Sequence, residues 1–415
     1  MKILIDAASY ASNISGIQRH ACNVVRCLLL QDEVSFVHFV IAPWQHKLVQ
    51  AAGIKPDARL STHIADMEPS SLSRNSWHYQ KLPKLAARLE VDLVHLTYPV
   101  PVNAAAFNCP TVVTLHDMYP YEIPMNFGFP KFIFNRLILK QCLRNVDVIA
   151  CVSDTTRLRL KQYSSPAVWK KSIRIYNCVE AQLTCSRQPP IPDWQDEPFL
   201  LCVAQHRRNK NLPLLIRSFH RLLRSGQVDS NMRLVILGIT AQDTNNIYRL
   251  VSTLNLGESI CFLEGLSEPE LQWCYTHCEA VVAPSLTEGF GLPVAEGLLA
   301  GCRIVCSDIP AHREVGDGQC RFVALGRDAE ITLALAIVEV LKAPKGNFAT
   351  LPQFSAPVLA KQYVSLYRRL TAPAASTRDA GTSASINVAT SEMQSLKFEN
   401  HIAMPPCGEE EHERI

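Results

Sequence analysis

Two glutamates eight residues apart carry the clearest chemical signal in the chain. Glu288 and Glu296 follow the apolar run Ala280–Pro284, which predicts a buried strand, and Pro293 between them suits the first turn of a helix. Glycines in the connecting loop let the backbone approach a ligand, and the free N–H groups of a helix start can hold phosphate. Carboxylates beside a phosphate need hydroxyl partners, so we expect both side chains to face one pocket that holds ribose and hexose. The alternative is a helix start whose acidic residues the helix dipole alone favours.

A basic cluster follows another predicted strand. Arg207, Arg208 and Lys210 come directly after the apolar run Phe199–Ala204. An arginine can bind a phosphate with two parallel hydrogen bonds, and a lysine binds it as a point charge. The cluster therefore predicts a diphosphate site that stabilises the charge of a departing nucleotide. A solvated basic loop is the alternative.

Two weaker signals lie in the first half of the chain. His116 ends the predicted strand Thr111–Leu115, where it can bind a sugar hydroxyl or can be a purely structural histidine. Gly16 precedes a helical pattern, and a glycine turn at a helix start can meet a phosphate. No G-x-G-x-x-G motif follows the first strand, which argues against a dinucleotide-dependent oxidoreductase.

Composition limits the class of protein. The chain has 415 residues, 47% of them hydrophobic and 19% charged, which predicts a globular protein of two domains. A net charge of +3 without a dominant basic stripe argues against a nucleic-acid partner. The 15 cysteines include no C-x-x-C pair and predict buried reduced thiols rather than a metal site. The first apolar run is too short for a signal peptide or a membrane span, so we expect a cytoplasmic protein.

The elements that must position these residues are strands of two parallel sheets. Short apolar runs alternate with amphipathic helical patterns, which is typical of parallel sheets covered on both faces. Six strands are expected in each half: Lys2–Ala7, Ser35–Ala42, Asp92–Tyr98, Thr111–Leu115, Val146–Val152 and Ser172–Tyr176, then Phe199–Ala204, Arg233–Leu237, Ser259–Leu263, Ala280–Pro284, Arg303–Cys306 and Cys320–Ala324. Ligands bind at the carboxyl ends of such strands, where the candidate residues lie.

Prolines and a change of composition set the expected boundaries. Four prolines near the middle of the chain predict an extended linker, and the tail is rich in Ser, Thr, Ala and Asn without a core pattern. The predicted parts are an N-terminal Rossmann-like domain, a linker, a C-terminal Rossmann-like domain, a closing helix and a disordered tail, at 1–185, 186–198, 199–355, 356–372 and 373–415.

The motifs together resemble a known family. Glu288 and Glu296, with the glycines and proline between them, look like the E-x7-E signature of family 4 retaining glycosyltransferases with the GT-B fold, in which two Rossmann-like domains face a central cleft. The similarity extends in collinear order over about residues 1–370, through the segments Ser15–Arg19, Cys151–Arg157, Tyr176–Val179, Asn209–Leu212, Ser307–Pro310 and Arg313–Val315.

The resemblance implies roles for single residues. Glu296 would hold the donor ribose, Glu288 and His116 the donor hexose, and Lys210 the phosphate. The backbone of Gly289, Phe290, Gly291 and Leu292 would face the pyrophosphate and sugar, and Gly16 is a further candidate for binding the donor. We predict His116, Glu288 and Lys210 as catalytic. The chain has Ala204-Gln205 where the family usually has glycine and a polar or basic residue, so the second basic group falls to Arg207 or Arg208.

The resemblance also implies a reaction. A nucleoside-diphosphate (NDP) sugar would be a substrate, no cofactor or metal would be needed, and a hexose, mannose by similarity, would pass with retention to a glycan or lipid-linked acceptor in bacterial surface-polysaccharide synthesis. The alternatives are a catalytically silent nucleotide-sugar-binding protein and an epimerase or phosphorylase of the same fold. The mixture of bulky apolar and basic residues in Lys131–Arg144 indicates either peripheral contact at the inner face of a membrane or a core-packed helix.

Overall fold

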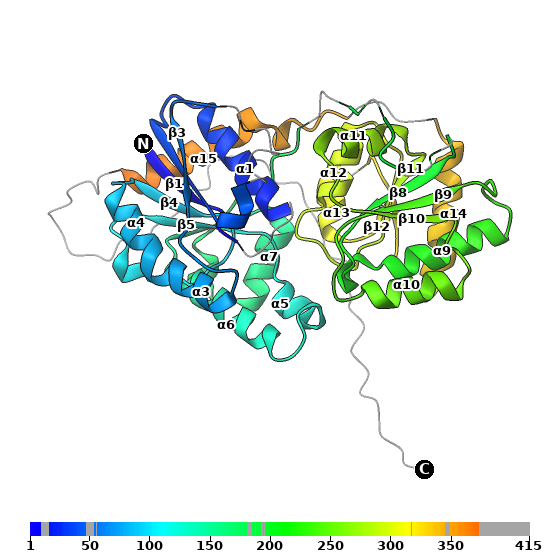
Figure 1. Cartoon of the computed structure of the whole chain (residues 1–415), viewed down its shortest axis with the longest axis horizontal. Helices are drawn as coiled ribbons and strands as arrows, with labels where there is room; N and C mark the ends of the chain where they lie inside the picture. Colours follow the sequence, from blue (N-terminus) through cyan, green and yellow to red (C-terminus); the bar gives the residue numbers. More distant parts are fainter. Residues whose placement is uncertain are drawn as a thin grey trace, which may run out of the picture. The chain divides into compact units, whose positions relative to one another are not determined.

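The computed structural model describes residues 1–9, 16–46, 54, 56–180, 185–186, 188–191, 194, 196–316, 318–344 and 349–372. Residues Met1–Ala372 form one compact unit. The predicted disordered tail lies outside the described residues, as do residues 187, 192, 193 and 195 of the predicted linker. The predicted domain boundaries therefore stay predictions, although both expected sheets are present (Figure 1).

The first sheet contains seven parallel strands in the order β3-β2-β1-β4-β5-β6-β7. They are β1 (Lys2–Asp6), β2 (Phe36–Ile41), β3 (Leu60–Ile64), β4 (Leu93–Leu96), β5 (Thr111–Leu115), β6 (Val148–Cys151) and β7 (Ser172–Arg174). The expectation of six strands was wrong because β3 was missed. This strand is at the sheet edge, none of its residues is fully buried and three are polar, so it lacks the continuous apolar run of a central strand.

The second sheet contains the six strands that the sequence predicts, in the order β10-β9-β8-β11-β12-β13. They are β8 (Phe199–Val203), β9 (Arg233–Leu237), β10 (Ile260–Leu263), β11 (Ala280–Ala283), β12 (Ile304–Ser307) and β13 (Arg321–Val323). In both sheets the strand order reverses beside the first strand, between β1 and β4 and between β8 and β11. Such switch points are where open parallel sheets bind ligands.

Helices cover both faces of each sheet (Figure 1). On β1, Ile3 and Ile5 pack into one hydrophobic cluster and Leu4 into another, as alternation along a buried strand requires. On β8, Leu200 and Leu201 divide in the same way. The helices are α1 (Gly16–Leu29), α3 (Ser71–Ser76), α4 (Leu82–Arg88), α5 (Tyr119–Glu122), α6 (Lys131–Asn145), α7 (Asp154–Tyr163), α8 (Pro166–Trp169), α9 (Leu212–Arg224), α10 (Thr244–Thr253), α11 (Glu268–His277), α12 (Leu292–Leu299), α13 (Pro310–Gly316), α14 (Ala329–Lys342) and α15 (Ala356–Thr371).

The last helix returns to the first sheet. Helix α15 buries Leu359, Tyr363 and Tyr367 in the cluster that also contains the inward face of α1. The Tyr367 hydroxyl lies 2.5 Å from Nδ1 of His95 on β4, and this histidine is fully buried in the core. No helix in the described ranges is long and apolar enough to cross a membrane.

Candidate donor site

The loop between β11 and α12 is clamped against the first domain. A Cβ at Gly289 would lie 1.7 Å from the carbonyl oxygen of His116, so only glycine fits there. The Gly289 carbonyl accepts hydrogen bonds from the hydroxyls of Ser153 and Thr156, the latter at 3.0 Å. Gly291 has φ = 99° and begins α12 in the left-handed conformation that glycine favours. Gly289 thus makes its close approach to the backbone of the first domain, and the predicted approach of this loop to a ligand stays a prediction.

Glu288 is held in this loop by three side chains. Lys210 Nζ donates to its Oε1 at 2.5 Å and the Ser285 hydroxyl at 2.7 Å, while the Tyr119 hydroxyl donates to its Oε2 at 3.2 Å. The Glu288 side chain is 10% exposed. Burial raises the pKa of Glu288, but the Lys210 charge and the hydrogen bonds outweigh it and leave that pKa below its ordinary value. Glu288 is therefore a carboxylate at neutral pH.

The basic cluster after β8 divides between the interior and the surface. Lys210 pairs with Glu288, whereas Arg208 is exposed. The Nε atom of Arg207 is buried and has no hydrogen-bonding partner. The positive charge of Arg207 also lowers the pKa of Asp117, although burial dominates and raises that pKa to about 6. Arg207 therefore lies near Asp117 at the carboxyl end of β5, whereas Arg208 is exposed.

Glu296 lies on α12 with different partners. The Tyr275 hydroxyl donates to its Oε2 at 2.7 Å, and Arg19 Nη1 lies 3.4 Å from its Oε1. Arg19 follows the Gly16 turn on α1 and also pairs with Glu268 at 2.9 Å. Burial raises the pKa of Glu296, and the Arg19 charge opposes that rise. Among the described residues, Glu288 and Glu296 share no hydrogen-bonding partner, so each carboxylate has its own setting.

His116 is in a defined protonation state. Its Nε2 lies 2.8 Å from the carbonyl oxygen of Thr97, which can only accept, so Nε2 carries the proton. Burial lowers the pKa of His116 to about 4, so the ring is neutral at pH 7. Nδ1 is then a hydrogen-bond acceptor, suited to a sugar hydroxyl. The His20 ring packs edge-on against it, with centroids 4.8 Å apart.

Two predicted donor-binding residues are limited by packing. The Phe290 side chain is buried against Tyr176 and Phe354, with ring centroids 6.0 and 5.1 Å away, so only its backbone is available to a ligand. A Cβ at Gly16 would lie 3.6 Å from Cδ1 of Leu292, which places the glycine turn against the start of α12. The residues that the resemblance named thus follow β1, β5, β8 and β11, at the switch points of the two sheets or one strand away.

Sequence reasoning missed four residues of the site, namely Arg19, Tyr119, Asn209 and Tyr275. Asn209 donates to the Tyr119 hydroxyl at 3.2 Å and accepts from Asn126 at 2.9 Å, which extends the Glu288 network. Tyr119 begins the short helix α5 and Asn126 ends the 3-10 turn after it, in a segment whose composition has no periodic pattern. Arg19 and Asn209 belong to motifs of the family resemblance, but only the fold brings them to Glu296 and Tyr119.

The arrangement can bind a polar, phosphorylated ligand. It offers two carboxylates for hydroxyl groups, Lys210 and Arg207 for phosphate, and the neutral His116 ring as an acceptor. Among the described residues, no three His, Cys, Asp or Glu side chains are grouped as a metal ion would require. The metal-independent reaction stays a prediction.

Two parallel sheets with polar residues at both switch points define a GT-B protein. Solved structures agree on the fold: HepE from Anabaena, in complex with UDP and glucose, has a TM-score of 0.62 at 16% identity and covers 89% of this chain and 100% of its own. Sucrose-phosphate synthase from Thermosynechococcus elongatus has a TM-score of 0.66 at 17% identity and covers 89% and 99%.

The chain belongs to the family 4 glycosyltransferases. Residues 14–183 match the model described as Glycosyltransferase Family 4, and residues 187–347 match Glycosyl transferases group 1. O-antigen chain mannosyltransferase RfbU of Salmonella typhimurium strain LT2 is 27% identical over 49% of this chain and 53% of its own length. O-antigen chain mannosyltransferase B of Escherichia coli is 24% identical over 76% and 84%. The chain therefore spans about half the length of the first of these curated relatives.

Proposed function

We propose that the chain transfers a hexose, with retention, from an NDP-sugar to a glycan or lipid-linked acceptor during surface-polysaccharide synthesis. The observation that carries the proposal is the Lys210–Glu288 pair at the β8/β11 switch point. A buried, ionised carboxylate can accept hydrogen bonds from hydroxyl groups, and the neighbouring lysine can bind a phosphate. The pair therefore suits a ligand that has both groups. The family membership supports the same reaction.

Each side chain then has one task. Glu296 accepts hydrogen bonds from the ribose hydroxyls, and Glu288 and Nδ1 of His116 accept them from the hexose. Lys210 donates one of its three N–H groups to Glu288 and can donate the other two to the diphosphate. Arg207 can bind the same diphosphate. These cations stabilise the charge of the departing nucleotide. The leaving phosphate assists deprotonation of the acceptor, and the protein supplies position and charge.

The sugar and the acceptor follow from the relatives. Both named relatives are O-antigen mannosyltransferases, which supports mannose as the sugar and a bacterial surface glycan as the acceptor.

Helix α6 supports peripheral contact with an anionic membrane. It buries Leu139, Cys142 and Leu143 but exposes 59% of Phe134 and 58% of Leu137, so it is neither fully core-packed nor fully solvated. Sedimentation with anionic liposomes at low and high salt tests this contact. Absence of binding at low salt removes it from the proposal.

A thermal-shift screen against UDP, GDP, ADP, CMP and their sugar conjugates tests the transferase. A ligand that binds only the folded state stabilises it by about 2.7 kcal/mol at a hundredfold excess over its Kd. We expect a shift with one nucleotide that is lost in Glu296→Ala, and sugar transfer that persists in EDTA. A folded protein that responds to none of these nucleotides favours the silent binding protein instead. Release of a sugar phosphate or an epimer, without transfer, identifies the other two reactions.

A further inference from the structure

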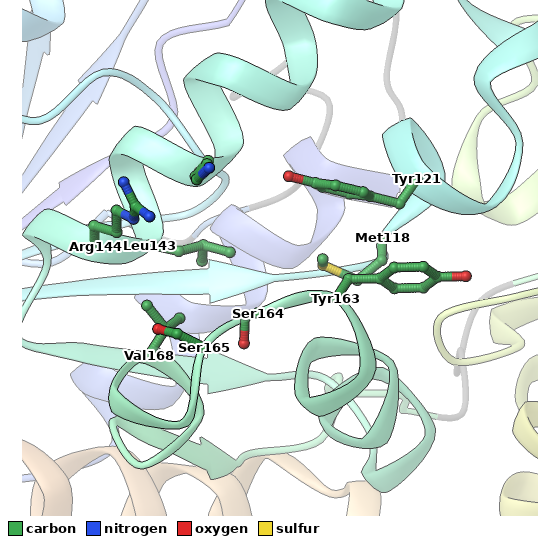
Figure 2. Close-up of a pocket in the computed structure, with 9 residues that line it drawn as sticks. Met118, Tyr121, Leu143, Arg144, Tyr163, Ser164, Ser165 and Val168 are labelled. Carbon is green, nitrogen blue, oxygen red and sulfur yellow. The ribbon is translucent and has the colours of Figure 1, made fainter.

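A cavity of about 290 Å³ lies in the first domain, apart from the donor-site residues (Figure 2). Four helices and the residues that connect them build it: α5, the C-terminal half of α6, the end of α7 and α8. Its lining residues are Met118, Tyr121, Lys140, Leu143, Arg144, Tyr163, Ser164, Ser165 and Val168. Met118 is two residues beyond His116, so the loop that carries the candidate catalytic histidine also forms a wall of this cavity.

The lining is positively charged. Lys140 and Arg144 are one helical turn apart on α6 and so lie on the same face of that helix. Within the described part of the chain, neither side chain pairs with a carboxylate, and no carboxylate lines the cavity. Glu122, which neighbours Tyr121 on α5, is already paired with Arg159 at 2.9 Å. The cavity therefore favours an anion.

The cavity also contains a hydroxyl without a partner. Ser164 Oγ is buried and makes no hydrogen bond. A buried hydroxyl in that state is costly, and native proteins rarely keep one without a reason. Ser164 lines the cavity (Figure 2), and a ligand hydroxyl or phosphate oxygen there can satisfy its hydroxyl once the side chain turns toward the cavity.

The remaining walls suit a sugar ring. Tyr121 and Tyr163 stack with ring centroids 5.4 Å apart, and the Arg136 guanidinium lies 5.0 Å from the centre of the Tyr121 ring. Figure 2 shows these tyrosines on the opposite side of the cavity from Arg144. The aliphatic side chains of Leu143 and Val168 complete the lining. Aromatic and aliphatic walls with a few polar groups are typical of sites for small organic ligands.

We propose that this cavity binds a monosaccharide phosphate, with the phosphate at Lys140 and Arg144 and the sugar between the tyrosines and Ser164. A volume of about 290 Å³ is at the small end of ligand pockets, which favours one sugar unit over an oligosaccharide. The identification of this ligand as the phosphorylated end of the glycosyl acceptor rests on the proposed function. The site itself rests on the cavity.

Isothermal titration calorimetry with mannose 1-phosphate tests the proposal on the full-length protein. The double variant Lys140→Gln/Arg144→Gln should weaken binding about tenfold, because two charge-assisted contacts are lost at an open site. The matched control is Lys84→Gln/Arg88→Gln, which removes the same charge at the same helical spacing on α4 and should leave binding unchanged. Ser164→Ala should weaken binding a few-fold without lowering the melting temperature, because it removes an unsatisfied hydroxyl.

Other probes separate the chemistry. Methyl α-mannoside, inorganic phosphate and geranyl phosphate should each bind more weakly than mannose 1-phosphate. If any of these three compounds binds as tightly as mannose 1-phosphate or more tightly, the ligand of the cavity is not a monosaccharide phosphate. If Lys140→Gln/Arg144→Gln binds mannose 1-phosphate with the affinity of the parent, the ligand binds elsewhere, for example at the donor site. That result refutes the cavity as the binding site.

The nucleotide screen separates the failure of this proposal from failure of the transferase. Nucleotide binding without sugar-phosphate binding refutes the cavity and leaves the proposed function standing. Sugar-phosphate binding at the cavity without any nucleotide binding supports the site and refutes its link to a glycosyl acceptor.

Discussion

The substitution Lys210→Met should lower the stability of the folded protein, because it breaks the ion pair between Lys210 and Glu288. In Lys210→Met the Glu288 carboxylate keeps its hydrogen bonds from Ser285 and Tyr119 but loses its cation. The two side chains are 17% and 10% exposed, so water screens the pair poorly. Removing one partner of a buried ion pair typically costs 3–5 kcal/mol, and the surviving hydrogen bonds favour the lower end, about 3 kcal/mol.

The stability difference between the parent and Lys210→Met should depend on pH. In the parent, the pKa of Glu288 is lowered, so its contribution to stability is present above the ordinary glutamate pKa and is lost as the pH falls through the folded-state value. In Lys210→Met, burial is the main remaining influence and raises that pKa above its ordinary value. The carboxylate then destabilises the folded state at neutral pH, and protonation relieves this cost as the pH falls. The difference in free energy of unfolding between parent and variant should therefore narrow from about pH 7 to about pH 5.

Urea denaturation of the parent, Lys210→Met, Glu288→Gln and the double variant measures these quantities. The double variant should lose about 2 kcal/mol less than the sum of the single variants, because each single change strands the other partner. Equal losses at both pH values, together with additive single variants, would refute the account of Glu288 as a carboxylate held by Lys210.

Three further changes probe other contacts of the site. Tyr119→Phe removes the hydrogen bond from the Tyr119 hydroxyl to Glu288. It should lower kcat about tenfold and leave the nucleotide affinity, measured by thermal shift, within about twofold of the parent. Arg19→Gln removes the charge that opposes the raised pKa of Glu296, so nucleotide affinity should fall at a higher pH than in the parent as the pH is lowered; identical pH profiles contradict this. Gly289→Ala should cost more than about 2 kcal/mol in urea denaturation because its Cβ meets a backbone carbonyl, whereas Gly257→Ala, with open space around it, should be nearly neutral.

The sequence predicted the fold well because buried parallel strands are continuous apolar runs. Twelve expected strands are present, and the helix α15 lies where the closing helix was expected. The missed strand, Leu60–Ile64, shows the limit of this reasoning, because an edge strand that is partly exposed has no such pattern. The return of α15 to the first sheet is a tertiary event and has no local signal.

The site was predicted in part for a similar reason. Residues at strand ends, such as Lys210 and Glu288, follow from the rule that ligands bind at the carboxyl ends of parallel strands. Their pairing depends on the spacing of β8 and β11, which are neighbours in the sheet but 80 residues apart in sequence. Tyr119 and Arg19 reach the site from the other half of the chain, and no periodic pattern in their own segments marks that contact.

The loops that carry the candidate donor-site residues are also the loops that join the two domains. At the start of α7, the backbone N–H groups of Asp154 and Thr155 donate to the Glu314 carboxylate at 2.6 and 2.9 Å, so α13 caps a helix of the first domain. The Gly289 carbonyl accepts a hydrogen bond from Ser153, which lies just after β6 at the start of α7. Arg19 on α1 forms an ion pair with Glu296. A nucleotide sugar that takes up Glu288 and Glu296 must compete with Tyr119 and Arg19 for them. Binding of the donor and contact between the domains therefore draw on the same carboxylates, which couples the two processes thermodynamically.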